Sequence, residues 1–211
     1  EHRAWDPREM QAIMAYCHQY DIDCMLRPAS IDKVSLYRHL EDGAAGMLVP
    51  HVNDIERATY LRDCLKFPPL GDRGIDGVGQ DNGFQFSDSI EYTSQANENT
   101  FLICQIETAE ALENAEQIIA TEGVDGVFVG PGDLQLRITK NNLEFTLEEA
   151  IEKVAALCKQ YGKAWGLPVS DVETGKKRYH QGARLIAYAG EFVTLVKMLN
   201  ENSAGLDEMT S

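Results

Sequence analysis

Short apolar runs alternate with amphipathic stretches along most of this chain. Runs of four to eight apolar residues bounded by Gly, Pro, Asn or Asp are typical of buried strands, and apolar positions at a spacing of three or four are typical of helices. The pattern predicts strands over 21–28, 45–50, 101–106, 127–129, 163–169 and 184–189. It predicts helices over 6–20, 31–40, 54–66, 87–97, 109–120, 146–161, 172–180 and 192–200.

Strands that alternate with helices in this way favour a parallel sheet covered by helices. The chain has 211 residues and starts at Glu1-His2, without a Met, at what reads as the end of another strand. That strand and one before it would bring the six predicted strands to eight. We therefore expect a TIM (β/α)8 barrel that lacks its first strands in this numbering. A single barrel domain is expected over 1–200, followed by a disordered polar tail over 201–211.

Two carboxylates follow neighbouring strands in the centre of the chain. Glu107 comes directly after the run Phe101–Ile106, and Asp133 follows the next run after Gly130-Pro131-Gly132. A strand, helix and strand in succession give parallel strands, so both carboxylates are expected at the same edge of the sheet. Two convergent carboxylates suit a hard divalent cation such as Mg²⁺ or Mn²⁺, and Co²⁺ is a further candidate.

Either carboxylate alone has a simpler explanation, since Asp and Glu often cap the helix that follows a strand. The pair on adjacent crossovers, with a Gly-Pro-Gly turn that leaves free N–H groups beside Asp133, favours a site instead. A polar loop is expected from there to the helix at residue 146.

Other polar groups are expected at the same edge. His2 and Arg27 follow strands, and Gln105 points to the same side of its strand as Glu107. A divalent ion can chelate a 2-oxo acid, an Arg can stabilise the developing enolate, and a His can exchange a hydroxyl proton. Considered alone, His2 reads as an exposed terminal residue, and Arg27 could simply pair with a loop carboxylate.

Composition narrows the classes of partner. The net charge of −15 and the absence of a basic stripe argue against nucleic acid, and no apolar run approaches the length of a membrane span. Five cysteines are spread singly without a zinc-binding spacing. They are expected to be free core residues in a reducing cytoplasm, and none is expected to act as a nucleophile.

Several motifs carry a resemblance over nearly the whole chain. QIET at Gln105–Thr108, GVDGVFVGPGDL at Gly123–Leu134, LVPHV at Leu48–Val52, FPPLGDRG at Phe67–Gly74, EH at the start and LRP at Leu26–Pro28 resemble the HpcH/HpaI family of class II pyruvate aldolases. The resemblance implies a metal-dependent barrel that cleaves 4-hydroxy-2-oxo acids to pyruvate and an aldehyde. It also implies a hexamer, a trimer of dimers that exchange their last helix.

The resemblance also implies roles for individual residues. Glu107 and Asp133 would bind the metal ion, while Gln105 and the backbone amides of Gly132 and Asp133 would bind pyruvate. Arg27 would stabilise the enolate and His2 would act as the acid and base through water. Glu1 would support His2 from behind.

Two neighbouring residues are expected to have supporting roles. Arg73 is expected to hold the Gly-rich loop over 67–86 in place, with contact to a charged aldehyde as the alternative. His51 follows the strand predicted over 45–50, at the same edge of the sheet as Glu107. It is expected, at most, to contact the metal ligands and not the metal ion itself.

Two other functions stay open at this point. A lyase of the citrate lyase β-subunit or malyl-CoA type would share the barrel and the metal, but the chain shows no basic cluster for the CoA phosphates. A non-catalytic protein that binds 2-oxo acids is conceivable, since Ile75–Phe86 departs from the Arg- and Ala-containing segment of the family's aldolases.

The last predicted helix has apolar residues around much of its circumference. Such a broad apolar surface needs to be covered, and a second subunit could cover it.

Overall fold

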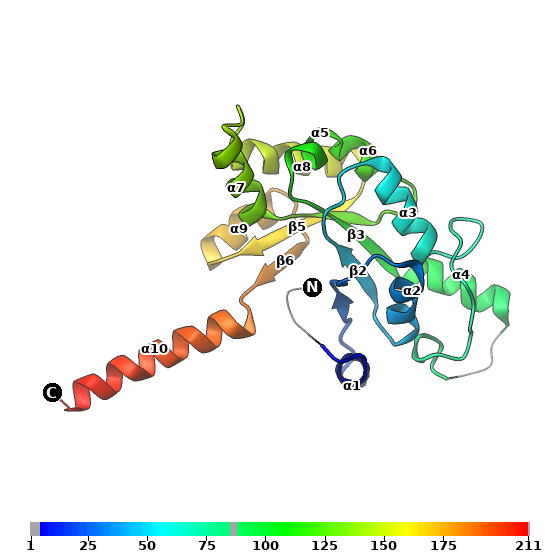
Figure 1. The fold of residues 1–211 in the computed structure, drawn as a ribbon, viewed down its shortest axis with the longest axis horizontal. Helices are drawn as coiled ribbons and strands as arrows, with labels where there is room; N and C mark the ends of the chain where they lie inside the picture. Colours follow the sequence, from blue (N-terminus) through cyan, green and yellow to red (C-terminus); the bar gives the residue numbers. More distant parts are fainter. Residues whose placement is uncertain (1–4, 85–87, 211) are drawn as a thin grey trace.

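The computed structural model describes residues 5–84 and 88–210, and in them six parallel strands form one sheet in the order β1-β2-β3-β4-β5-β6. The sheet curves into a half-barrel with helices around its outside (Figure 1). The strands are β1 (Met25–Leu26), β2 (Gly46–Val49), β3 (Phe101–Ile106), β4 (Gly126–Val129), β5 (Ala164–Val169) and β6 (Leu185–Tyr188). The helices are α1 (Pro7–Gln19), α2 (Lys33–Glu41), α3 (Ile55–Leu65), the short 3₁₀ helix η1 (Gln80–Asn82), α4 (Ser89–Asn99), α5 (Ala109–Glu113), α6 (Ala115–Ala120), α7 (Pro131–Asn141), α8 (Leu147–Tyr161), α9 (Val172–His180) and α10 (Glu191–Thr210).

Side-chain caps fix where most of the helices begin. Asp6 accepts a hydrogen bond from the backbone of Arg8 and forms a capping box with Glu9, and Thr146 forms one with Glu149. Both boxes satisfy backbone N–H groups that the first helical turn leaves without partners. Further caps of the same kind, from Asp or Thr, begin α2, α3, α4, α5 and α9.

The two faces of the central strand β3 have different surroundings. Leu102, Cys104 and Ile106 point outward into the main core beneath the helices. Ile103 points inward and packs with Leu48 and Phe128 of the neighbouring strands. Because side chains alternate along a strand, Gln105 and Glu107 point the same way as Ile103, toward the inside of the half-barrel.

Three predicted elements differ in the structure. Strand β1 has two residues where 21–28 was expected, because Asp21-Ile-Asp23 is exposed. The predicted helix over 109–120 divides at Asn114, which ends α5 and begins α6. The polar loop expected after Asp133 is wrong, because helix α7 begins at Pro131. Pro is favoured at the first position of a helix, and the buried Leu134 and Ile138 stand one helical turn apart.

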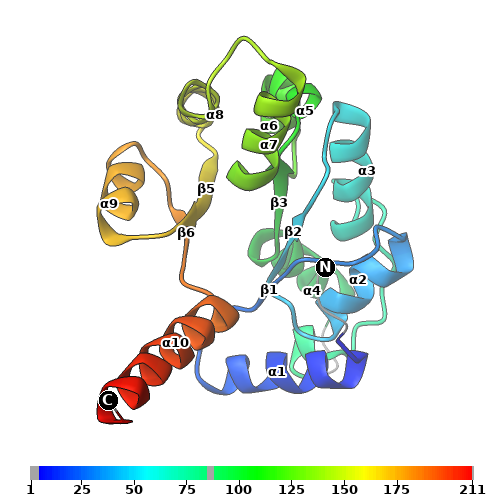
Figure 2. The same cartoon turned by 60° about the vertical axis from the view of Figure 1, so that its left-hand side comes forward.

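The expected disordered tail is also wrong for residues 201–210, since α10 continues to Thr210. This segment has no Pro, and its Leu, Met, Glu and Ala residues are good helix formers. Helix α10 projects away from the body of the molecule, as two views show (Figures 1 and 2). Its large apolar side chains are at least half exposed, including Val193 at 74% and Met209 at 82%.

Glu1 and His2, with the strand that was expected to end there, lie outside the described residues. Of the helices in residues 5–84 and 88–210, none is both long and apolar enough to cross a membrane.

Candidate active site at the carboxyl edge of the half-barrel

Glu107 is a fully buried carboxylate at the carboxyl end of β3. Its Oε2 accepts a hydrogen bond of 2.5 Å from Nε2 of Gln105. Its Oε1 accepts one of 2.8 Å from the backbone N–H of His51 and lies 3.0 Å from Nδ1 of that imidazole. Among the described residues, no Lys or Arg forms an ion pair with this carboxylate. A buried carboxylate is costly unless it is paired or binds a metal ion, so Glu107 is suited to a cation.

Gly130 lies against this carboxylate from the next strand. Its backbone N–H donates to the carbonyl of Ile106, and Val129 pairs with Ile106 across the sheet. A Cβ built on Gly130 would lie 2.7 Å from Nε2 of Gln105 and 3.0 Å from Oε2 of Glu107. Only a glycine therefore allows the end of β4 to approach the carboxylate so closely.

Asp133 lies in the first turn of α7, directly after β4. Its side chain is half exposed, and Oδ1 pairs with Nη1 of Arg137 one turn along the helix at 2.9 Å. The N–H groups of Gly132 and Asp133 fall in the first turn, where backbone donors have no acceptor within the helix. A Cβ at Gly132 would meet nothing within 4 Å, so there is open space beside these donors. A helix N-terminus of this kind suits an anionic group.

The remaining predicted residues fall in three places. Arg27 directly follows β1, half-buried, at the same edge of the sheet as Glu107. Its side chain helps to line a separate pocket of about 330 Å³ beside Trp5 and Met10. His2 and Glu1 lie outside the residues that the structure describes.

Arg73 lies in a cluster that holds the loop after α3. Its Nη2 donates to Oδ2 of Asp81 at 2.8 Å and to the hydroxyl of Tyr92 at 3.3 Å, and the guanidinium stacks 4.5 Å from the ring centre of Phe67. Burial and a hydrogen bond from its hydroxyl to Asp81 raise the pKa of Tyr92. This cluster ties the Gly-rich loop to α4.

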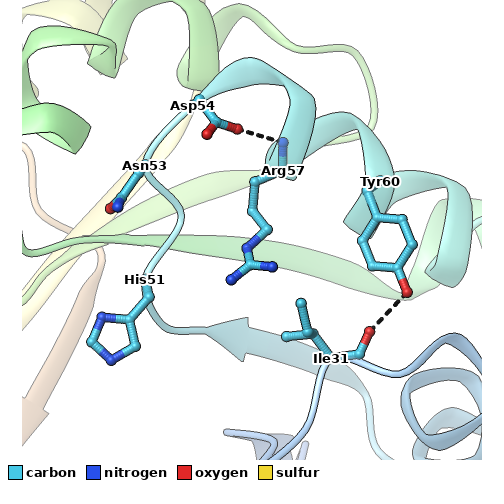
Figure 3. A pocket seen from close by; sticks show the side chains of 6 residues that line it. All are labelled: Ile31, His51, Asn53, Asp54, Arg57 and Tyr60. Atoms are coloured by element: carbon cyan, nitrogen blue, oxygen red, sulfur yellow. Dashed lines mark hydrogen bonds between the residues drawn. The ribbon is translucent and has the colours of Figure 1, made fainter.

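His51 and its surroundings carry a feature that the sequence did not reveal. The residue has a left-handed backbone, with φ of 56°, that turns its imidazole toward Glu107. Its side chain also lines a pocket of about 450 Å³ with Ile31, Asn53, Asp54, Arg57 and Tyr60 (Figure 3). Arg57 in the first turn of α3 was a usable signal, because a basic residue there is disfavoured by the helix dipole.

The donor set fits a hard divalent ion. Glu107 offers carboxylate oxygens, and Oε1 of Gln105 is buried without a hydrogen-bond partner among the described residues. Such oxygen ligands are those that Mg²⁺ and Mn²⁺ prefer. Within residues 5–84 and 88–210, no three His, Cys, Asp or Glu side chains form a metal-binding group, so the protein ligands described here would be few. Cys104 and Cys158 are not suited to nucleophilic attack, since burial raises the pKa of each thiol to about 12.

Comparison with known proteins decides the family. The family model described as HpcH/HpaI aldolase/citrate lyase matches residues 7–197. The chain belongs to this family. A 4-hydroxy-2-oxo-heptane-1,7-dioate aldolase of Klebsiella pneumoniae is 32% identical over 191 residues, which cover 90% of this chain and 70% of the relative.

Two further relatives agree with the HpcH/HpaI assignment. A 2-keto-3-deoxy-L-rhamnonate aldolase of Salmonella paratyphi B is 31% identical over 198 residues, covering 93% of this chain and 72% of the relative. The crystal structure of an HpcH/HpaI aldolase from Desulfitobacterium hafniense superposes with a TM-score of 0.91 at 25% identity, covering 99% of this chain and 81% of that one. The chain is a lyase of the aldolase type, and the resemblance stated from its sequence motifs is confirmed.

Proposed function

We propose that this chain is a metal-dependent aldolase that cleaves a 4-hydroxy-2-oxo acid to pyruvate and an aldehyde. The observation that carries the proposal is the buried carboxylate of Glu107, which only Gln105 and His51 contact by hydrogen bonds or ion pairing among the described residues. The two curated relatives act, by their names, on a seven-carbon oxo acid with two carboxylates and on a deoxy sugar acid. Both names fit the same substrate class.

Glu107 and Asp133 are the proposed metal ligands. When bound, a divalent ion would polarise the keto oxygen of the substrate as a Lewis acid. Asp133 would have to turn from Arg137, which is an exchange of one exposed ion pair of small free energy.

The substrate is proposed to lie between α7 and β3. Its carboxylate would accept hydrogen bonds from the N–H groups of Gly132 and Asp133 at the start of α7. Gln105 donates one Nε2 proton to Glu107 and has a second that can donate to a substrate oxygen. The same side chain would therefore hold both the carboxylate ligand and the substrate.

Cleavage then follows from charge placement. A base removes the proton of the 4-hydroxyl, the bond between C3 and C4 breaks, the aldehyde leaves, and the bonding electrons form the pyruvate enolate. Arg27 would stabilise the negative charge on the enolate oxygen, and a proton added at C3 completes pyruvate. His2, the acid and base implied by the family resemblance, would carry these protons.

The wider assembly belongs to the proposal as well. Two further strands between β6 and β1 would close the described half-barrel into a (β/α)8 barrel over one domain. The exposed apolar side chains of α10 support a hexamer in which this helix packs on a neighbouring subunit. Five free cysteines suit a cytoplasmic location.

The test is proton exchange at the pyruvate methyl group in D₂O, followed by NMR on the complete polypeptide. It examines only the enolate step, so the aldehyde need not be known. We expect exchange with Mg²⁺ that EDTA abolishes and that Arg27→Ala lowers by about 100-fold or more. Arg8→Ala on the exposed face of α1 is the matched control. Absence of exchange with Mg²⁺, Mn²⁺ and Co²⁺ would exclude the proposal and favour a protein that only binds 2-oxo acids.

A further inference from the structure

A pocket of about 450 Å³ opens beside His51 (Figure 3). It lies between the loop after β1, which supplies Ile31, and the start of α3. His51 is shared between the two sites, since its imidazole contacts Glu107 and also lines this pocket. The volume falls in the range of small-molecule sites. Because His51 belongs to both, we take the pocket as an outward extension of the proposed active site.

Polar groups of Tyr60 and Asn53, which line the pocket, already have hydrogen-bond partners. The hydroxyl of Tyr60 donates to the carbonyl of Ile31 at 3.0 Å, which joins α3 to the loop after β1. Oδ1 of Asn53 accepts from Thr108, and its carbonyl accepts from Nδ2 of Asn114. These bonds fix the shape of the pocket without occupying its interior.

The carboxylate of Asp54 also has a hydrogen-bond partner within the protein. Its Oδ1 accepts a hydrogen bond of 2.7 Å from the backbone N–H of Arg57 and caps α3. The carboxylate thereby satisfies one donor at the start of the helix. It forms no ion pair with the guanidinium of Arg57, according to the contacts of the described residues.

The guanidinium of Arg57 is different from these groups. It points from α3 into the pocket, toward the space between His51 and Ile31 (Figure 3). In residues 5–84 and 88–210 it has neither an ion-pair nor a hydrogen-bond partner, although the chain has 34 acidic residues against 19 Lys and Arg. Its place in the first turn of α3 adds to the positive potential of the helix N-terminus. The pocket therefore presents a positive group that this chain leaves for an anion.

We propose that Arg57 binds a second carboxylate, at the far end of the substrate from the 2-oxo acid group. This inference rests on the proposed function and refines it to substrates that yield a carboxylate-bearing aldehyde. A planar guanidinium can hold a carboxylate through two parallel hydrogen bonds, and it discriminates against an uncharged chain end of the same length. Arg57 is then a specificity-determining residue.

Binding of unreactive analogues tests the inference without requiring turnover. The probes are 2-oxo acids of five to seven carbons with a carboxylate at the far end, each compared with the monoacid of equal length. They lack the 4-hydroxyl and are not cleaved. Isothermal titration in the presence of Mg²⁺ should show at least one diacid that binds about tenfold or more tightly than its monoacid.

The variants assign that preference. Arg57→Gln should bring the ratio of diacid to monoacid affinity to about one, and Arg57→Lys should give an intermediate ratio. Arg8→Gln on α1 should give the same ratio as the unmodified protein. Thermal melting of each variant checks the fold. A ratio near one for every chain length, or a ratio that persists in Arg57→Gln, would overturn the inference.

The same samples separate this inference from the proposed function. Pyruvate methyl exchange reports on the enolate step alone. Lack of exchange together with a diacid preference that depends on Arg57 would overturn the aldolase and keep the carboxylate site. Exchange without the preference would keep the aldolase and overturn the role of Arg57.

Discussion

Glu107 and Gly130 are in direct contact across two adjacent strand ends. A Cβ at Gly130 would lie 2.8 Å from Cβ of Glu107, a separation that real Cβ atoms do not show without displacement of a neighbour. The buried carboxylate thus owes its position to the missing side chain of the next strand as well as to its own hydrogen bonds.

Gly130→Ala should displace the hydrogen-bonded pair of Gln105 and Glu107. Overpacking of this kind costs about 1–3 kcal/mol in the free energy of unfolding, and we expect a loss of about tenfold in Mg²⁺ affinity. Urea denaturation and isothermal titration measure the two effects.

Gly132→Ala is the matched control for Gly130→Ala. It lies two residues away in α7, where a Cβ meets nothing within 4 Å. It should leave Mg²⁺ affinity unchanged and raise the free energy of unfolding by up to about 1 kcal/mol, because Ala is favoured over Gly in helices. Equal effects of both alanines would show that the close contact at Gly130 is unimportant.

Glu107→Gln should remove the binding of a divalent ion while keeping the size of the side chain. We expect Mn²⁺ affinity, measured by electron paramagnetic resonance of the free ion, to fall by about 100-fold or more. Glu113→Gln, an exposed carboxylate on α5, should bind Mn²⁺ like the unmodified protein. Unchanged affinity in Glu107→Gln would remove this residue from the proposed ligands.

Glu148→Gln should destabilise the contact between α8 and α9 in a pH-dependent way. Arg178 donates to both oxygens of Glu148, at 2.7 and 2.8 Å, and this arginine is mostly buried. The hydrogen bonds from Arg178, and then from Lys177, lower the pKa of Glu148 from 4.5 to about 2. Since the carboxylate is 37% exposed, water screens the pair and we expect a loss of only about 1 kcal/mol at neutral pH.

The sign of the pH effect follows from the lowered pKa. The stabilisation is complete above about pH 4.5 and is lost as the pH falls toward about 2. Urea denaturation at pH 7 and at pH 3 should therefore show a smaller difference between Glu148→Gln and the unmodified protein at the lower pH. Glu152→Gln on the exposed side of α8 is the control, and a difference that does not change with pH would contradict this explanation.

Substitution of Leu195 and Leu199 by Glu should reduce the oligomeric state. Both side chains are more than half exposed, at 51% and 56%, and lie one turn apart on α10. Two charges on this surface would be costly to bury against a second subunit. Sedimentation velocity should show smaller particles than for the unmodified protein or for Asn200→Glu. A mass that none of these changes alters would place the subunit contacts elsewhere.

Periodicity predicted most of the fold because the strands, apart from Gln105, are apolar and most of the helices carry their own caps. The predicted bounds of Phe101–Ile106 and Val172–His180 agree with β3 and α9. Helix α7 was missed because Gly130-Pro131-Gly132 was interpreted as a turn, although Pro at a first helical position needs no hydrogen-bond donor. The length of α10 was missed because its second half is too polar to show an apolar stripe.

Strand order predicted the position of Glu107 at the carboxyl edge, and the family resemblance supplied most residue roles. What the sequence could not show is which side chains already have partners. From the sequence alone, Asp54 and Arg57 would be interpreted as an ordinary exposed ion pair. In the structure, the carboxylate of Asp54 caps α3 and the guanidinium of Arg57 points into a pocket. Distinctions of this kind depend on rotamers and on tertiary contacts, which local patterns do not contain.

The strands that precede Glu107 and Arg27 differ in length, and we expect them to differ in local unfolding. Strand β3 has six residues and is hydrogen-bonded on both sides, whereas β1 has two residues and, within the described part of the chain, pairs only with β2. Amide hydrogens next to Glu107 should therefore exchange with solvent far more slowly than those next to Arg27. If Arg27 contacts the substrate as proposed, binding should slow amide exchange at β1 more than at β3.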